Sequence, residues 1–178
     1  MSRGLPPRWR TGRIGVPEYT RPATWEDVKR LARYLEEAGA EYAIIGGYAL
    51  AAHGLSRFTE DVDVLVNPAV ANSRRWIVAL SRLPDGAARE LAADPDVFAT
   101  GQRYAIRIND EITVDVLPAA AGHDWDELKR HIVERDIDGM RVKVLDLEGL
   151  LKTKEVPRPK DQADADAIRR AIELLKGQ

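Results

Sequence analysis

The chain has 178 residues, of which 44% are hydrophobic and 31% charged, as expected for one globular domain. Its 27 basic and 29 acidic residues give a net charge of -2, which excludes the overall basic excess of a dedicated nucleic-acid-binding protein. The absence of cysteine excludes a disulfide framework, an iron–sulfur cluster, a Cys-ligated zinc and a thiol nucleophile. Because no apolar run approaches the roughly 20 residues of a membrane span and no secretory signal is present, we expect a soluble, cytoplasmic protein with no membrane partner.

Residues 1–23 are rich in Pro, Gly and Arg and carry a net charge of +4. We expect them to form an extended basic arm outside a single domain of residues 24–178. Two interpretations of the arm remain open: a terminus draped over the surface, and a segment that contacts a polyanion.

The domain begins with signals typical of a helix. Thr24 and Asp27 have the spacing of a capping box, with Asp in place of the usual Glu or Gln. Four apolar residues then recur at helical spacing: Val28, Leu31, Leu35 and Ala38. Gly39 suits the position after a helix C-terminus, so a helix is predicted between these signals.

Two strands and a short helix are predicted next. Residues 42–45 form an apolar run typical of a buried strand, which ends in two glycines at 46–47. Residues 48–53 are good helix formers. After a polar loop, residues 61–66 alternate between acidic and aliphatic side chains before turning apolar, which predicts a second strand.

The rest of the chain alternates between helices and strands. Asn67 is the expected cap and Pro68 the expected first residue of a helix whose apolar stripe we interpret as core packing. The later predicted elements are, in order, strands at 104–108 and 112–117, a short helix from Trp125, a strand or hairpin at 137–144, a helix from Asp146 to Pro157 and a last helix from Pro159. Strands and helices mixed in this way indicate an α/β or α+β domain.

The most informative feature is the pair Asp61 and Asp63 in the second predicted strand. Side chains two apart on a strand point to the same face, so Val62 and Val64 face the core while both carboxylates face the other side. Their Cβ atoms should lie about 6 to 7 Å apart, close enough for one metal ion to bind both carboxylates. Such hard oxygen ligands favour magnesium or manganese over zinc, and a divalent cation would remove the repulsion between them.

Asp115 repeats this arrangement on the polar face of the strand at 112–117. If the two strands are neighbours, the three carboxylates can form a two-metal site for phosphoryl transfer. The alternative is that Asp61-x-Asp63 is merely a solvated strand face, and the dipeptide alone does not decide between them.

Gly46 and Gly47 provide a second feature. A strand that runs into two glycines and then a helix lets backbone N–H groups approach a phosphate. The alternative is a tight turn with no ligand. The turn is not a Walker A loop, because no Gly-Lys-Ser/Thr follows it, and the chain contains no GxGxxG dinucleotide fingerprint.

The combination of Gly46-Gly47, thirteen intervening residues, Asp61-x-Asp63 and then Asp115 resembles the nucleotidyltransferase superfamily of the DNA polymerase β type. Residues 44–66 (IIGGYALAAHGLSRFTEDVDVLV) are similar to small stand-alone prokaryotic members, including those related to AbiEii-type toxin–antitoxin systems. Residues 150–167 continue this similarity, which covers most of the chain. The resemblance implies a short mixed β-sheet flanked by helices, with further helices at the C-terminus.

The resemblance also implies an activity. Asp61 and Asp63 would hold two magnesium or manganese ions that bind the triphosphate of an NTP, and Asp115 would bind the catalytic metal and help to deprotonate the attacking hydroxyl. Gly46 and Gly47 would cradle the phosphates. The reaction would transfer a nucleoside monophosphate to a hydroxyl of a tRNA 3′ end, a protein or a small molecule. A cognate antitoxin is a candidate partner.

Basic residues outside these motifs are further candidates for phosphate binding. Arg57 and Thr59 lie in the loop before the acidic pair, where Arg57 is either a phosphate ligand or a solvated charge. A second basic cluster comprises Lys152, Lys154, Arg158 and Lys160. We rank Lys152 and Lys160 first because the resemblance places basic residues there; the alternative is ordinary helix-surface charge. His53 is expected to be structural, and no histidine has the spacing of a zinc ligand.

A competing interpretation from another class remains open, namely a nucleotide-binding or interaction module that keeps the fold without turnover. A glycosidase is disfavoured, because two carboxylates two residues apart on one strand cannot flank a scissile bond.

Overall fold

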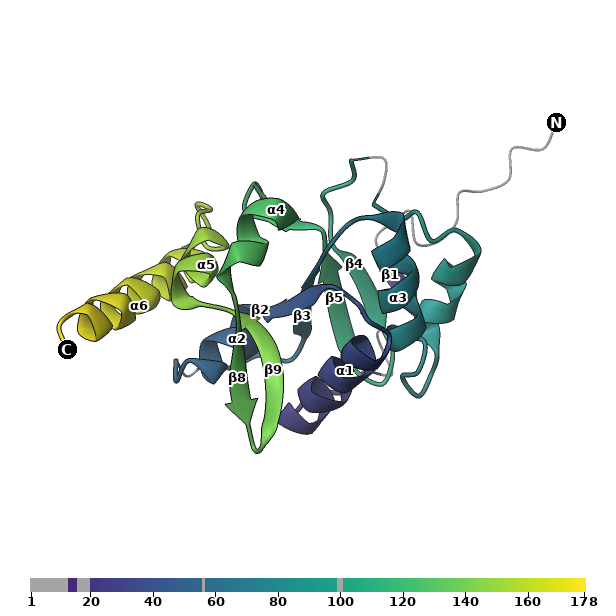
Figure 1. Ribbon diagram of the computed structural model, residues 1–178, viewed down its shortest axis with the longest axis horizontal. Helices are drawn as coiled ribbons and strands as arrows, with labels where there is room; N and C mark the ends of the chain where they lie inside the picture. Colours follow the sequence, from purple (N-terminus) through teal and green to yellow (C-terminus); the bar gives the residue numbers. More distant parts are fainter. Residues whose placement is uncertain (1–12, 16–19, 56, 99–100) are drawn as a thin grey trace.

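The computed structural model describes residues 13–15, 20–55, 57–98 and 101–178, which fold around one mixed β-sheet (Figure 1). The strands of this sheet are β1 (Arg13–Gly15), β2 (Tyr42–Ile45), β3 (Val62–Val66), β4 (Ile106–Asn109), β5 (Thr113–Leu117), β8 (Ile132–Ile137) and β9 (Met140–Leu145). Their order is β1-β4-β5-β3-β2-β9-β8, with parallel and antiparallel pairings alternating across the sheet. A separate two-stranded pair is formed by β6 (Ala119–Ala120) and β7 (His123–Asp124).

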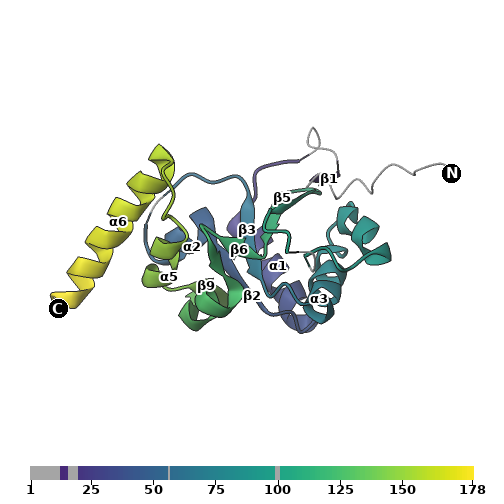
Figure 2. The ribbon, with the colours of Figure 1, turned by 90° about the horizontal axis from the view of Figure 1, so that it is seen from above.

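Helices flank this sheet, as predicted. They are α1 (Trp25–Glu37), α2 (Gly46–Ala52), α3 (Val70–Leu80), α4 (Trp125–Leu128), α5 (Leu147–Lys152) and α6 (Pro159–Lys176), with short 3₁₀ segments at Ala87–Ala93 and Lys129–His131. Helices α1 and α3 lie side by side on one side of the sheet, while α6 packs on α5 and its C-terminal end projects from the body (Figures 1 and 2). None of the helices in the described ranges is long and apolar enough to cross a membrane.

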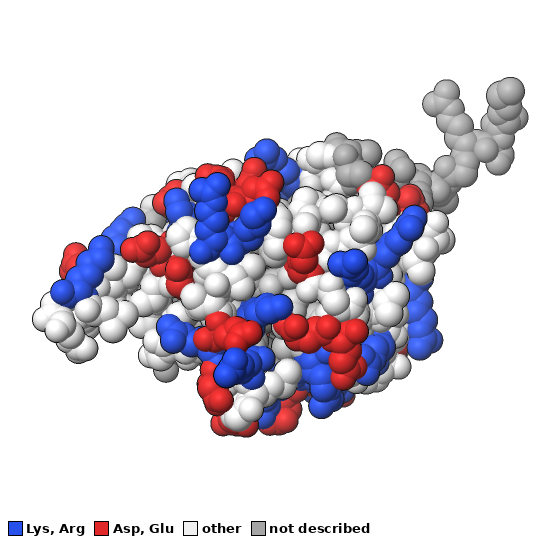
Figure 3. Space-filling model, viewed as in Figure 1, with Lys and Arg blue, Asp and Glu red and all other residues white. Residues whose placement is uncertain are grey.

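The core lies between the sheet and the α1–α3 layer. Val28, Leu31 and Leu35 of α1 have no exposed surface, and Val62 and Val64 of β3 are equally buried. Burying each such side chain contributes about 1.5–3 kcal/mol. Because neighbouring residues on a strand point to opposite faces, this burial turns Asp61 and Asp63 toward the other face of the sheet. Basic and acidic side chains are interspersed over the outer surface seen in Figure 3.

Several predicted elements are confirmed. The side chain of Thr24 accepts a hydrogen bond from the Asp27 N–H, and the Asp27 carboxylate accepts one from the Thr24 N–H, which completes the capping box of α1. The strand predicted at 42–45 is β2. Asp146 caps α5 by accepting from the N–H of Gly149 at 2.7 Å.

Several predicted boundaries were wrong, and three of them have a physical reason in the structure. Helix α3 begins at Val70, because the Asn67 side chain accepts from the Ala69 N–H in a local turn instead of capping a helix at Pro68. The hairpin predicted at 137–144 begins earlier, at β8, whose central residues are exposed and charged and lack a strand pattern. Helix α5 ends at Lys152, five residues before Pro157.

The described part of the predicted basic arm belongs to the domain. β1 pairs in parallel with β4, and Ile14 is buried in the core; residues 1–12 and 16–19 lie outside the described ranges. Arg21 donates hydrogen bonds of 2.7 and 2.9 Å to both carboxylate oxygens of Asp27 and forms an ion pair with Glu111. This network joins the chain before α1 to the turn between β4 and β5.

The buried Asp27 carboxylate predicts an acid-dependent loss of stability. Burial raises its pKa, but hydrogen bonds from Arg21 and Thr24 outweigh burial and lower it from 3.8 to about 2. The ionised group therefore stabilises the native state above pH 4, by about 2 kcal/mol, and this contribution is lost as the pH falls from 4 toward 2. Urea unfolding should show that Asp27→Asn is destabilised at pH 7 and approaches the wild type at pH 2. Asp166→Asn, which breaks only an exposed pair with Arg169, should change stability by less than about 0.5 kcal/mol. A pH-independent difference would contradict this role of Asp27.

Candidate active site

Four charged side chains share the sheet face opposite the α1–α3 layer. Arg107 on β4 lies in register with Asp115 on the antiparallel strand β5, and Asp115 lies in register with Asp63 on the parallel strand β3. Paired residues on neighbouring strands point to the same face, so three adjacent strands present Arg107, Asp115 and Asp63 in one row. Asp61, just before β3, joins this group.

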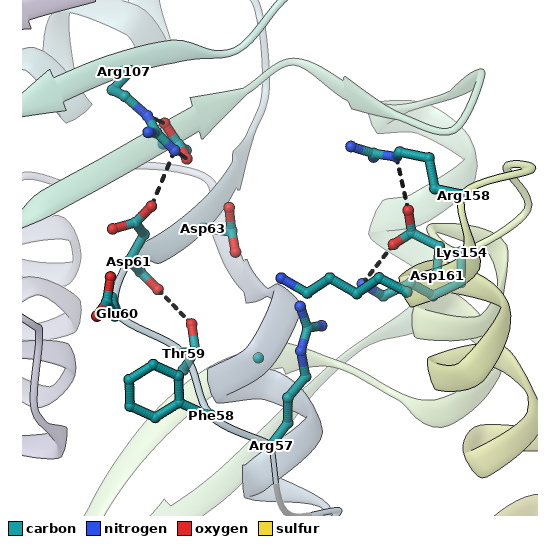
Figure 4. A pocket seen from close by; sticks show the side chains of 13 residues that line it. Arg57, Phe58, Thr59, Glu60, Asp61, Asp63, Arg107, Lys154, Arg158 and Asp161 are labelled. Carbon is teal, nitrogen blue, oxygen red and sulfur yellow. Dashed lines mark hydrogen bonds and ion pairs between the residues drawn. The ribbon is translucent and has the colours of Figure 1, made fainter.

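These residues form one wall of a pocket of about 510 Å³ (Figure 4). Its lining residues are Gly47, Arg57, Phe58, Thr59, Glu60, Asp61, Asp63, Arg107, Asp115, Lys154, Arg158, Lys160 and Asp161. Lys154, Arg158 and Asp161 come from α6 and the chain before it and lie across the pocket from Asp61 and Arg107. The pocket thus places carboxylates of the sheet opposite a wall that is mainly basic.

Arg107 bridges two of the three predicted carboxylates. Its Nε and Nη2 atoms donate to the two oxygens of Asp115 at 2.9 and 2.8 Å, and Nη2 also donates to Asp61 Oδ2 at 3.0 Å. The hydrogen bond to Asp115 raises the pKa of Arg107, which stays charged. We did not predict this residue as part of the site. The available signal was its position between Ile106 and Ile108 on a strand facing Asp115 across a tight turn.

Asp63 differs from the other two carboxylates. Across the described residues, no side-chain hydrogen bond or ion pair reaches its carboxylate. Burial, followed by the negative charge of Asp115, raises its pKa to about 7. Burial also raises the pKa of Asp61, against the lowering effect of Arg107. The cluster therefore carries more negative charge than Arg107 alone balances.

The two glycines lie in the first turn of α2, not before it. Gly46 has φ +67°, and a Cβ there would lie 2.2 Å from Asp63 Oδ2. A Cβ at Gly47 would lie 2.6 Å from Cβ of Thr59, whose hydroxyl donates to the Asp61 carbonyl. The glycines thus allow α2 to lie directly against Asp63 and the loop before β3. Phosphate binding by Gly46 and Gly47 stays a prediction.

Acidic residues of α6 hold the basic wall in place. Asp164 forms ion pairs with Arg57 and, at 3.0 Å, with Lys154; Asp161 pairs with Lys154 at 3.2 Å and with Arg158 at 2.9 Å. Both aspartates are largely buried. Arg57 and Lys154 are therefore fixed beside the pocket and do not extend into solvent.

The two lysines that we ranked first lie in different places. Lys160 lines the pocket and makes no ion pair or side-chain hydrogen bond with any residue that the structure describes. Lys152 lies in a separate depression between α5 and α6, beside Glu148 and Arg169, and Lys154 reaches the pocket instead.

His53 has a structural role, as expected. Its Nε2–H donates to the Leu145 carbonyl at 2.8 Å, which leaves Nδ1 as the acceptor for Arg135 at 3.1 Å. Burial lowers the pKa of His53 and favours this neutral ring. The residue joins the end of α2 to the β8–β9 hairpin.

The donor set suits a hard divalent cation in its chemistry, because it consists of carboxylates and one of them has no partner. Within the described ranges, no group of three or more His, Cys, Asp or Glu is already arranged as a metal-ligand set. Arg107 engages oxygens of both Asp61 and Asp115. A cation that bound all three carboxylates would have to compete with this guanidinium.

No protein-family model matches the chain, and no curated protein matches it. Among solved structures, the chain is similar to a candidate nucleotidyltransferase from Thermotoga maritima, with 13% identity and a TM-score of 0.48 over 86% of this chain and 92% of that chain. It is also similar to an antigenic nucleotidyltransferase-like protein from Paracoccidioides brasiliensis, with 21% identity and a TM-score of 0.48 over 86% of this chain and 78% of that one. The functional argument below therefore depends on the residues of the pocket.

The contact between Gly47 and Thr59 predicts a specific steric effect. Gly47→Ala should reduce the free energy of unfolding by about 1–3 kcal/mol, because the new Cβ would overlap Thr59 Cβ. Thr59→Gly in the same chain should recover part of this loss, which chemical denaturation can measure. Gly177→Ala, whose Cβ would meet only ordinary contacts at 3.6 Å or more, is the control and should be nearly neutral. Equal losses in the Gly47 single and double variants would contradict the proposed contact.

Proposed function

We propose that this chain is a nucleotidyltransferase that moves a nucleoside monophosphate from an NTP to an acceptor hydroxyl and releases pyrophosphate. The observation that carries this proposal is the group of carboxylates at the neighbouring strands β3 and β5, which faces basic side chains across a pocket of about 510 Å³. A triphosphate is strongly anionic, so it suits the basic wall formed by Lys154, Arg158 and Lys160. Because Lys160 forms no ion pair or side-chain hydrogen bond within the described ranges, its ammonium group is free to contact a phosphate.

Asp61, Asp63 and Asp115 would hold magnesium or manganese, with two ions as the expected number. When bound, these ions would neutralise phosphate charge and increase the acidity of the acceptor hydroxyl. The unpaired, half-buried Asp63 supports this assignment, because a cation beside it would favour the charged form that desolvation disfavours. Asp115 would accept the proton of the acceptor hydroxyl, and Gly46 and Gly47 would let backbone N–H groups approach the phosphates.

The acceptor is the open part of the proposal. A tRNA 3′ end, a protein hydroxyl and a small molecule all carry the required hydroxyl, and the pocket is polar enough for each of them. A toxin–antitoxin role with a cognate antitoxin is the biological setting that we propose on the resemblance of residues 44–66.

The contacts of Arg107 favour a second candidate function. The guanidinium already neutralises part of the charge of Asp61 and Asp115. A chain that balances its carboxylates in this way could bind a nucleotide in the pocket without transferring any group from it. The two functions differ in whether label from an NTP moves to an acceptor.

The decisive experiment incubates the purified chain with each of four α-labelled NTPs, magnesium or manganese, and total cellular RNA and protein. We expect metal-dependent transfer of label, and nuclease or protease treatment of the product would identify the acceptor class. Metal-dependent NTP binding without transfer to any acceptor would favour the binding module.

Variants of the carboxylates should separate catalytic from structural roles. Asp63→Asn should preserve or raise the stability of the metal-free chain, since it removes like-charge repulsion. It should abolish stabilisation by metal and lower the transfer rate by a factor of about 100 or more, which corresponds to about 3 kcal/mol. Asp115→Asn should keep much of the NTP affinity while losing transfer. Asp166→Asn, on the exposed side of α6, is the matched control and should transfer at the wild-type rate. If Asp63→Asn unfolds the chain and metal does not stabilise the wild type, the carboxylates are structural.

Phe58 predicts a contact with a base of the substrate. It lines the pocket between Arg57 and Thr59, yet it is 81% exposed. An exposed aromatic ring beside a phosphate-binding wall can stack on a nucleobase, which contributes about 1–3 kcal/mol. Phe58→Ala should therefore raise the KM for the NTP or for an RNA acceptor about tenfold, whereas Phe58→Trp should keep it near the wild-type value. Val78→Ala removes an exposed apolar side chain (61%) from α3 and should leave both KM values unchanged. Unchanged KM values for both substrates in Phe58→Ala would contradict the stacking role.

A further inference from the structure

Arg107 occupies the position between two carboxylates that a bridging cation would need. A single atom, Nη2, lies 3.0 Å from Asp61 Oδ2 and 2.8 Å from Asp115 Oδ2. The remaining oxygen of Asp115 accepts from Nε at 2.9 Å, so both of its oxygens are engaged. A divalent cation cannot bridge these same oxygens while the guanidinium remains, because the two positive charges would compete for one site.

The surroundings of Arg107 allow its side chain to move without movement of the sheet. The backbone of β4 is paired on both sides, with β1 at Arg13 and with β5 at Asp115. The Arg107 side chain, by contrast, is 44% exposed, while the Asp115 side chain is only 14% exposed. Rotation of the side chain toward solvent would therefore free the carboxylates and leave them in place.

The charge balance gives Arg107 a role in the metal-free chain. Three carboxylates line one wall of the pocket, and among the described residues Arg107 forms ion pairs with two of them. On the opposite wall, Lys154 and Arg158 are held by Asp161 and Asp164 instead, and Lys160 forms no ion pair with any described residue. Loss of Arg107 would leave the carboxylates repelling one another at close range.

We propose that Arg107 is an exchangeable internal counter-ion: it holds Asp61 and Asp115 in position in the metal-free chain and leaves them when a divalent cation binds. This inference rests on the proposed function, which places the cation at these carboxylates. It makes Arg107 a positioning residue for the metal ligands and couples cation binding to release of its side chain. The released guanidinium is then free to contact an anionic substrate in the same pocket.

A titration with Mn²⁺, followed by the electron paramagnetic resonance signal of the free ion, tests the exchange in the whole chain. Removing the competing charge in Arg107→Ala or Arg107→Gln should lower the Kd for Mn²⁺ about tenfold, since a charge-assisted hydrogen bond contributes about as much as one factor of ten in affinity. Both variants should also have a lower Tm than the wild type without metal and a larger rise in Tm with Mn²⁺. Arg82→Gln is the matched control, because the Arg82 side chain is equally exposed (44%) and pairs with a single exposed carboxylate, that of Glu37. Its Kd for Mn²⁺ should equal that of the wild type.

A second measurement uses the wild-type chain and does not depend on the folding of a variant. The Nε–H signal of Arg107 in a nitrogen–proton NMR spectrum, assigned by its absence in Arg107→Lys, should shift and exchange faster with water when Mg²⁺ is added. The proposal that Arg107 gives way to a cation is overturned if this NMR signal is unchanged at saturating Mg²⁺. It is also overturned if the Arg107 variants bind Mn²⁺ no more tightly than the wild type.

The outcomes also separate this inference from the proposed function. Wild-type transfer of label together with equal Mn²⁺ affinity in all variants would overturn the exchange alone. Mn²⁺ binding by Arg107→Gln but not by the wild type would support the counter-ion role and contradict metal-dependent transfer by the wild type. Failure of every variant to bind Mn²⁺ would overturn both.

Discussion

The architecture of the site depends on one electrostatic constraint, the gathering of three carboxylates on one face of a sheet. Asp63 and Asp115 lie in register on neighbouring strands, and strands in a sheet are only about 4.8 Å apart. Two anions at such a distance repel each other strongly when they are partly buried. The chain meets this constraint in two ways: Arg107 binds Asp115 and Asp61, and the raised pKa of Asp63 lets that group hold a proton near neutral pH.

The scaffold keeps this charged group in place from the opposite face. The aliphatic residues between the acidic ones are buried against α1 and α3, so a rotation of β3 that separated the carboxylates would expose Val62 and Val64. On the far side of the pocket, α6 uses Asp161 and Asp164 to fix Arg57 and Lys154. Each wall therefore has its own internal ion pairs, and the space between the walls remains open for a ligand.

Much of the fold follows from local patterns in the sequence. The capping box at Thr24, the apolar run of β2 and the alternation at 61–66 were predicted correctly, because each depends on residues close together in the chain. The errors occurred where local signals competed. Asn67 formed a turn with Ala69 instead of a helix cap, and the charged, exposed strand β8 carried no apolar period.

The local sequence was sufficient to place Asp61 and Asp63 on one face, because that depends only on the two-residue period of a strand, whereas Asp115 joins them through the pairing of β3 with β5. The tertiary structure decided which residues meet them. Arg107 reaches Asp61 only because β4, β5 and β3 are neighbours. Lys154, and not Lys152, lies at the pocket, because α5 ends before Lys154 and because Asp161 and Asp164 of α6 bind the Lys154 side chain. Such contacts join residues up to about a hundred positions apart, as between Arg57 and Asp164, and no local period of the sequence encodes them.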